Sequence, residues 1–148
     1  MSDLKSYEKL KFEKLLGMDS GYVLDFSNST FHDFILESTG IDIYNEKYNW
    51  SSGSKANRLR AFWQEESNNQ VTKLNSDLLE HWKTLRLINK SEIGKREQQL
   101  YVYEECIQIN ERLRQESIEN HIEVIKPYYD EKGFSLLAKS IRESIQKK

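Results

Sequence analysis

Cationic side chains gather in one segment of the chain, where they could bind an anion. Residues 47–64 include four basic residues and no carboxylate, whereas acidic and basic residues are well mixed elsewhere. Lys55, Arg58 and Arg60 fall in the first two turns of a predicted helix that begins after Ser54, where the helix dipole favours anions over cations. The segment therefore predicts either an anion-binding site or acidic groups that fold back onto it.

The residues around this helix indicate which anion would bind. At helical spacing Lys55 and Arg58 share one face, and the free backbone N–H groups after Ser54 suit a phosphate group. Tyr44, Tyr48 and Trp50 precede the helix and could stack on nucleic-acid bases. This combination predicts contact with nucleic acid or with an acidic face of a partner domain.

An internal explanation of the same cations is also open. Asp25 and Asp42 lie in two segments that we expect to be strands, and they could neutralise Arg58 and Lys55 or come together as an acid pair. We favour pairing with the cations. In that case the basic helix stabilises the domain, and the aromatic residues beside it belong to the core.

A second pair, Arg114 and His121, could act on phosphodiesters. A spacing of seven residues places both on one face of a predicted helix, about 10 Å apart along its axis. In such a pair the His would be a general base and the Arg would stabilise phosphate charge, as in HEPN-type ribonucleases, which are all-α dimers. The alternative is an arginine that reaches a glutamate beside a core or interface histidine.

The remaining reactive groups lack partners at useful spacing. His32 and Asp33 are adjacent, and His81 has no second ligand one helical turn away, so neither predicts a metal site. Cys106 has no neighbouring His or Cys and is expected to be a small core residue. Gly53 stands alone, so no nucleotide-binding loop is predicted. We expect neither a metal nor a cofactor.

Helices must position these residues, because one proline and six glycines in 148 residues predict long helices and few tight turns. We predict a mainly α fold, with a small two-stranded β element in the first third and a long helix in the second half. The first predicted helix is residues 4–16, with Tyr7, Leu10, Lys11 and Leu15 on one stripe, and the second is capped by Ser27 or Ser29 and ended by Gly40. The basic helix, with Leu59, Phe62 and Trp63 buried, is followed by a helix from Asn68 or Asn69 through Leu85. A long helix over residues 91–126 is closed by Pro127, and a last helix carries Phe134, Leu137, Ala138, Ile141 and Ile145. The predicted strands are residues 22–26 and 41–44.

Composition limits the class of protein and its organisation. A net charge of −2 excludes a general nucleic-acid coat, and a single cysteine excludes a disulfide framework and fits a reducing cytoplasm. No apolar run reaches the ~18–20 residues of a membrane span, so we expect no membrane contact. We predict a globular helical domain over residues 1–90, followed by a long helix and a C-terminal helix over residues 91–148.

Several segments resemble the N-terminal region of bacterial abortive-infection proteins. They are, in order, GYVLDFSNSTFHDFI, STGIDIYNEKY, GSKANRLRAFW and the helix that ends in LLEHW. The later segment FSLLAKSIRESIQKK is similar to the one that leads into the C-terminal effector domain of those proteins. The resemblance implies antiphage defence, in which an N-terminal part senses or regulates and a C-terminal part, HEPN-like in many members, does the damage.

On this basis we predict a non-enzymatic sensor or regulatory domain that contacts nucleic acid or a partner domain through its basic helix. The resemblance implies an effector domain in cis, and the chain ends about where that effector would begin, so we expect a fragment or a stand-alone module. A homodimer through the long helix is also expected, because its apolar residues occupy more than one narrow stripe. The alternative is a ribonuclease that uses Arg114 and His121.

Overall fold

The computed structural model describes residues 1–89 and 96–146, and this part of the chain is mainly helical. Its helices are α1 (Ser6–Leu15), α2 (Asn28–Thr39), α3 (Lys55–Glu65), α4 (Asn68–Ile88), α5 (Arg96–Ile125) and α6 (Glu131–Gln146), with single turns of 3-10 helix at η1 (Met18–Ser20), η2 (Glu46–Tyr48) and η4 (Lys126–Tyr128). The mainly α prediction is confirmed. None of the helices described is both long and apolar enough to cross a membrane.

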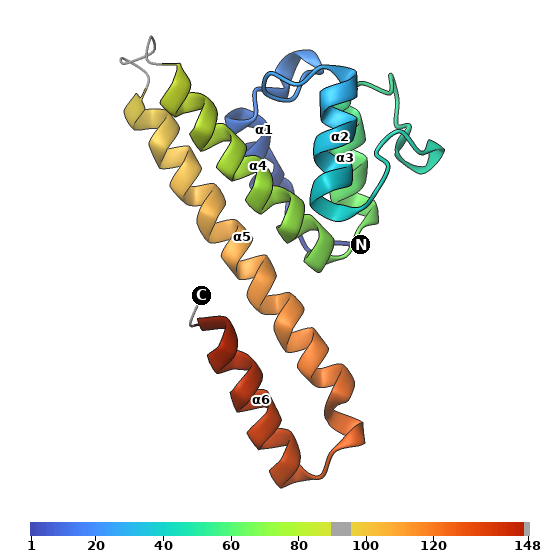
Figure 1. Cartoon of the computed structure of the whole chain (residues 1–148), viewed down its shortest axis with the longest axis vertical. Helices are drawn as coiled ribbons and strands as arrows, with labels where there is room; N and C mark the ends of the chain where they lie inside the picture. The colour runs from blue at the N-terminus through green and yellow to red at the C-terminus, as the bar shows by residue number, and fades with distance from the viewer. Residues whose placement is uncertain (90–95, 147–148) are drawn as a thin grey trace.

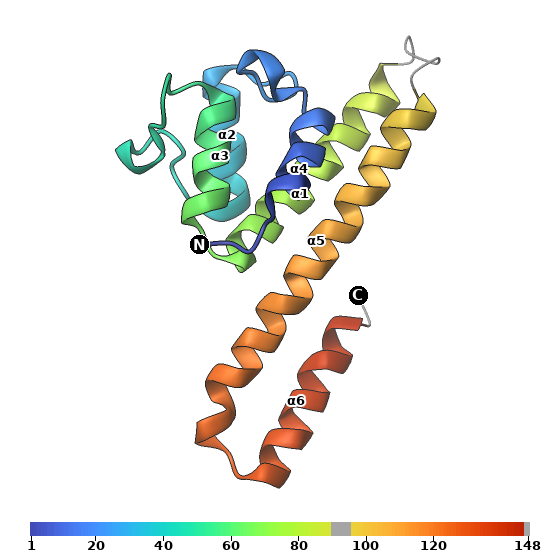
Figure 2. The same ribbon diagram turned by 180° about the vertical axis from the view of Figure 1, so that it is seen from behind.

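The helices form a globule with a protruding arm. Helices α1 to α4 surround one core, and the first half of α5 lies along α4 and α1 (Figures 1 and 2). The second half of α5 extends past the globule and turns back through η4 into α6, which lies beside it (Figure 1). We call residues 114–146 the arm.

The core is centred on Trp63 of α3. Its side chain is fully buried, its ring lies 6.0 Å from that of Phe12, and its indole N–H donates a 3.0 Å hydrogen bond to Asn75. Helix α5 adds Cys106 and Leu113 to the same core. The core therefore crosses residue 90, and the division into two parts at that point stays a prediction.

Local sequence signals set the helix ends. The side chains of Ser27, Ser54 and Ser67 each accept a hydrogen bond from the backbone N–H three residues later, as N-cap residues do. Gly40 ends α2 in the left-handed conformation. Helix α5 ends at Ile125 just before Pro127, as predicted; residues 91–95 of the predicted helix lie outside the described residues.

The prediction of a two-stranded β element is wrong, because residues 22–26 and 41–44 form turns and no strand occurs within residues 1–89 and 96–146. The N–H of Leu24 donates to the Leu16 carbonyl at 2.8 Å, and Leu24 has a φ of 48°. In the other segment the N–H of Tyr44 donates to the side chain of Asp42. The alternating pattern arises because Val23 and Ile43 point into the core from turns.

The stripe predicted for the first helix is wrong in part, although its member Leu15 does belong to the core. Tyr7 and Leu10 are exposed, whereas Phe12 and Glu8 are buried. Helix α5 packs on this side of α1, and Arg112 of α5 binds the Glu8 carboxylate. The contact that decides the buried face of α1 is therefore made about 100 residues away in the sequence.

Candidate functional site

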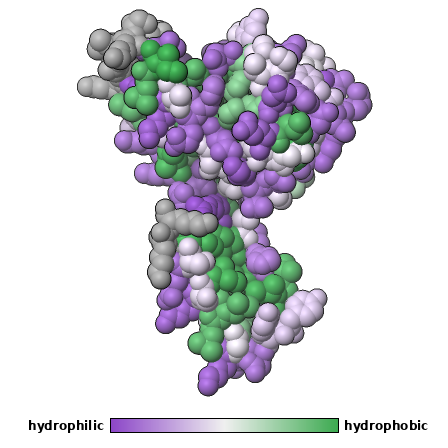
Figure 3. Space-filling view, in the orientation of Figure 1, coloured by the Kyte–Doolittle hydropathy of each residue, from purple (hydrophilic) through white to green (hydrophobic). Residues whose placement is uncertain are grey.

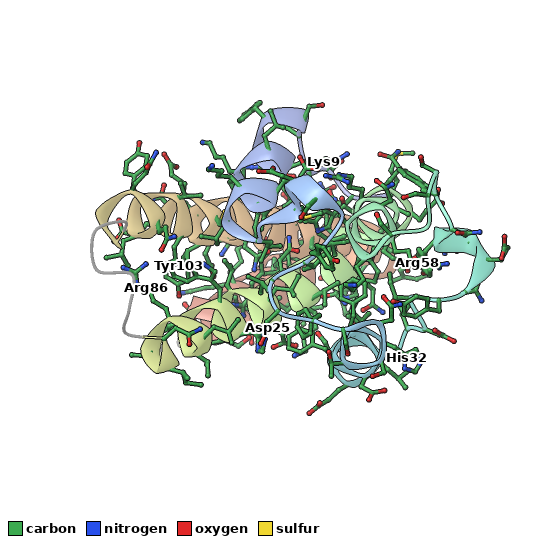
Figure 4. The ribbon with its side chains drawn as sticks, turned by 90° about the horizontal axis from the view of Figure 1, so that it is seen from above. Lys9, Asp25, His32, Arg58, Arg86 and Tyr103 are labelled. Atoms are coloured by element: carbon green, nitrogen blue, oxygen red, sulfur yellow. The ribbon has the colours of Figure 1, made fainter. Side chains whose placement is uncertain are left out.

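Arg58 of the basic helix holds a loop of its own domain. Its Nε donates to the carbonyl of Gly53 at 3.1 Å, its Nη1 to the carbonyl of Ile43 at 3.0 Å and its Nη2 to the side chain of Asn49 at 3.2 Å. The guanidinium also lies 4.6 Å from the centre of the Tyr44 ring. Figure 4 shows Arg58 on the side of the molecule where this loop lies. All three nitrogens of the side chain thus serve the fold.

The other two cations of α3 are also engaged within the domain. Arg60 forms an ion pair with Glu13 of α1. Lys55 donates to the side-chain oxygen of Asn28 at 3.1 Å and lies 4.9 Å from the centre of the Tyr22 ring. Of the three, Lys55 has the partners that a competing anion would displace most easily, since they are an amide and an aromatic ring.

The predicted pairing of the two aspartates with these cations is wrong. Asp25 lies 3.0 Å from the imidazole of His81, and Asp42 lies 3.4 Å from that of His32. In Figure 4, Asp25 and Arg58 lie in separate regions. The aspartates therefore neither neutralise the basic helix nor form an acid pair.

Of the three aromatic residues expected to stack on bases, Trp50 is exposed, with 37% of its surface accessible, and Tyr44 is half-buried beside the Arg58 guanidinium. Tyr48 is buried, and its hydroxyl donates a 2.8 Å hydrogen bond to Glu66. Lys47 reaches the same carboxylate oxygen at 2.8 Å. Burial alone would raise the pKa of Glu66, but the hydrogen bonds from Lys47 and Tyr48 outweigh it and hold that pKa below its ordinary value of 4.5.

We expect Glu66→Gln to lower stability at neutral pH and to have a smaller effect in acid. A carboxylate whose pKa is lowered on folding stabilises the fold above its unfolded pKa, and this contribution is lost as pH falls through the folded pKa. The gap between wild type and variant should therefore shrink below about pH 4.5. Urea unfolding at a series of pH values measures it, and a gap that stays constant down to about pH 3 would contradict the assignment.

The sequence-predicted ribonuclease pair lies on the arm, outside the core. His121 is exposed, and no described residue forms a hydrogen bond with it. The Arg114 guanidinium is 40% exposed, and its carboxylate neighbour is Glu111 at 4.0 Å. The alternative of a core histidine is wrong because His121 is exposed, whereas an interface position stays a prediction; the arginine lies beside a glutamate, as that alternative expects. The ribonuclease function stays a prediction.

A pocket of about 370 Å³ lies between α2 and α4. Ser38 donates a hydrogen bond to Asp77 at 2.5 Å, and Lys73 reaches the same oxygen at 2.7 Å. His81 lines the pocket but is paired with Asp25. These contacts hold the two helices together. The Asp77 carboxylate that Ser38 contacts also binds Lys73. This arrangement does not activate the Ser38 hydroxyl as a nucleophile.

A broad apolar face on the arm has no partner in the described chain. Ile122 of α5 and Ala138 of α6 are buried. Six other apolar residues on the same side of the two helices remain only half-buried. We call them the arm face; they are Ile118, Ile125, Phe134, Leu137, Ile141 and Ile145. Figure 3 shows hydrophobic residues gathered over the arm and not covered by the globule.

Polar contacts fix how the arm helices face each other. Arg142 of α6 donates two hydrogen bonds to the Glu119 carboxylate of α5, from Nε and from Nη2, each 2.8 Å long. By helical geometry Glu119 lies on one side of Ile122, and Ile118 and Ile125 lie on the other. The ion pair therefore closes one edge of the hairpin and leaves the arm face on the opposite side.

Comparisons with protein-family models, with curated proteins and with solved structures each gave no match. The resemblance to abortive-infection proteins accordingly stays a prediction from the quoted motifs.

The sequence predicts the apolar residues of the arm face, but it does not predict that they form one surface outside the globule. The spacing from Phe134 to Ile145 predicts an amphipathic helix, which α6 is. The spacing does not indicate that α6 lies beyond the globule, where its apolar side packs beside α5. The pocket between α2 and α4 was missed because nothing in the local pattern relates Ser38 to Asp77.

Proposed function

We propose that this chain is a non-enzymatic regulatory interaction domain, and that the arm face is the surface through which it binds another helical protein surface. The observation that carries this proposal is the half-buried state of Leu137, Ile141 and their neighbours in a helix that, among the described elements, packs beside α5 alone. Contiguous apolar surface of this kind on a folded domain is typical of interaction sites.

The energetics of the arm support a binding role. Full burial of one Leu or Ile side chain contributes about 1.5–3 kcal/mol relative to full exposure. The six residues of the arm face obtain only part of this within one chain. A helical partner that covers them would gain on the order of several kcal/mol, before the entropy cost of association is subtracted.

The contacts of the basic helix also favour a binding surface on the arm, because the arginines of α3 are already bound within the domain. Arg58 and Arg60 are bound to groups of the same domain, so nucleic-acid contact through them would require breaking those bonds. A contact surface on the arm needs no such loss. We therefore place the binding surface on the arm rather than on α3.

The biological role that we propose is regulation in antiphage defence. It rests on the motifs that resemble abortive-infection proteins, in which the N-terminal part senses or regulates. Most of helix α6, from Phe134 onward, belongs to the segment FSLLAKSIRESIQKK, which resembles the sequence leading into their effector domain. By this resemblance, the arm is the element through which such a regulatory domain would meet an effector domain.

A photo-cross-linker placed on α6 tests the arm face in the cell. We would substitute benzoylphenylalanine at Leu137 on the arm face, or at Leu136, which is 63% exposed and points to the other side of the helix. Irradiation should give protein adducts from position 137 and few from position 136. Equal labelling at both positions, or none at either, would contradict the proposal.

A further inference from the structure

The arm lacks a second layer of helices over its arm face, and a second arm could supply that layer. Two antiparallel helices bury one seam, which here contains Ile122 and Ala138, and leave the adjoining apolar sides open. Two hairpins stacked with these sides together form a four-helix bundle, in which a second layer covers the first. We propose that the occupant of the arm face is a second copy of this chain, an inference that rests on the proposed function because it names the partner of the same surface.

The size of the arm face is suited to such a contact. Helix α6 has 16 residues, so the face is about 24 Å long. Two adjacent helices, each about 10 Å across with side chains, make it roughly 20 Å wide. The flat area of the face, its length times its width, is then on the order of 500 Å² per copy. The uneven surface of the side chains adds to it. Two copies together approach the ~1,200 Å² at which specific protein interfaces begin.

The charges of the arm match those of a second arm better than those of nucleic acid or an acidic membrane. Residues 114–146 carry five basic and six acidic side chains, so neither polyanions nor anionic lipids are attracted to them. By helical spacing the charged residues nearest the arm face are Arg114 on α5 and Asp130 before α6, one of each sign. Two arm faces therefore meet without net repulsion and with few charges to desolvate.

The position of the arm leaves room for the second copy. In both ribbon views the second half of α5 and α6 extend beyond the globule (Figures 1 and 2). The hydrophobic side seen in Figure 3 is uncovered along the arm. A second arm can therefore lie against it while the two globules stay apart.

Sedimentation equilibrium or light scattering on the purified chain tests this inference. We expect wild type to show twice its chain mass of 17.6 kDa at tens of micromolar. Leu137→Glu/Ile141→Glu should weaken self-association by roughly 100-fold or more, because each carboxylate would be buried in the interface. Leu136→Glu, on the far side of α6, is the matched control and should remain a dimer.

A double alanine variant keeps the test valid if the charged double variant loses its helix. Ile118→Ala/Ile125→Ala removes apolar surface from the arm face while keeping good helix formers, and should weaken association by roughly 10-fold or more. Circular dichroism then verifies that the helix content is retained.

The outcomes separate this inference from the proposed function. A wild-type chain that stays at 17.6 kDa up to about 100 µM overturns the second copy. If position 137 still cross-links to another protein, the interaction role stands without self-association. A dimer that is unaffected by the arm-face variants and disrupted by Leu136→Glu also overturns the inference, because it would use another surface.

Discussion

Replacing Arg112 with alanine is expected to lower the free energy of unfolding by about 3 kcal/mol. Arg112 of α5 binds the Glu8 carboxylate of α1 through two nitrogens, Nε at 3.2 Å and Nη2, and its Nη1 contacts Glu116 at 2.7 Å. The Glu8 side chain is only 5% exposed. Without Arg112 this buried carboxylate would keep, within the described part of the chain, its hydrogen bond from the Lys5 backbone N–H alone. Urea unfolding at neutral pH measures the loss.

Two companion variants identify the source of this loss. Glu116→Ala removes the more exposed partner of Arg112 and should cost less than about 1 kcal/mol. Glu8→Ala/Arg112→Ala removes the unpaired charge as well, so it should be less destabilised than the sum of the two single variants. An Arg112→Ala variant within about 0.5 kcal/mol of wild type would show that the contact does not hold α5 to α1.

Replacing Arg58 with lysine should cost about 2 kcal/mol of folding free energy even though the charge is kept. A single ammonium group cannot reach the carbonyls of Gly53 and Ile43 and the Asn49 side chain at once, as the guanidinium does. The carbonyls would be left with weaker partners, and the loop from residue 43 to residue 53 would lose its common anchor. Thermal unfolding followed by circular dichroism measures the change.

Lys55→Met is the matched control on the same helix. Its ammonium contacts one amide oxygen and one ring, so its loss should change stability by about 0.5 kcal/mol or less. If Arg58→Lys is as stable as wild type, Arg58 acts as a simple cation, and the nucleic-acid interpretation of α3 becomes the better one. The pair of variants therefore decides between a structural and a binding role for the basic helix.

Local features of the fold were predictable because they depend on neighbours in the sequence. The caps at Ser27 and Ser54, the end of α2 at Gly40 and the apolar spacing of α4 each involve residues within a few turns. Burial of Leu59, Phe62 and Trp63 on α3 was confirmed for the same reason.

The features that failed depend on contacts between distant segments. The sequence around Glu8 does not reveal that Arg112 will lie opposite, and so the wrong stripe of α1 was expected to be buried. The segments around Val23 and Ile43 alternate like strands because a turn that inserts one apolar side chain into a core leaves the same pattern. Arg58 was predicted to contact an anion or a partner, whereas it binds the carbonyls of Gly53 and Ile43, and these backbone partners carry no signature in the sequence.

Helix α5 runs for 30 residues without proline or glycine, a length of about 45 Å. Its first half is built into the core through Cys106 and Leu113, and its second half supports the arm. Such a helix behaves as a stiff lever rather than as a tether. A partner that tilts or twists the arm would therefore apply a torque to the globule, and the first bonds to bear it would be those between Arg112 and Glu8.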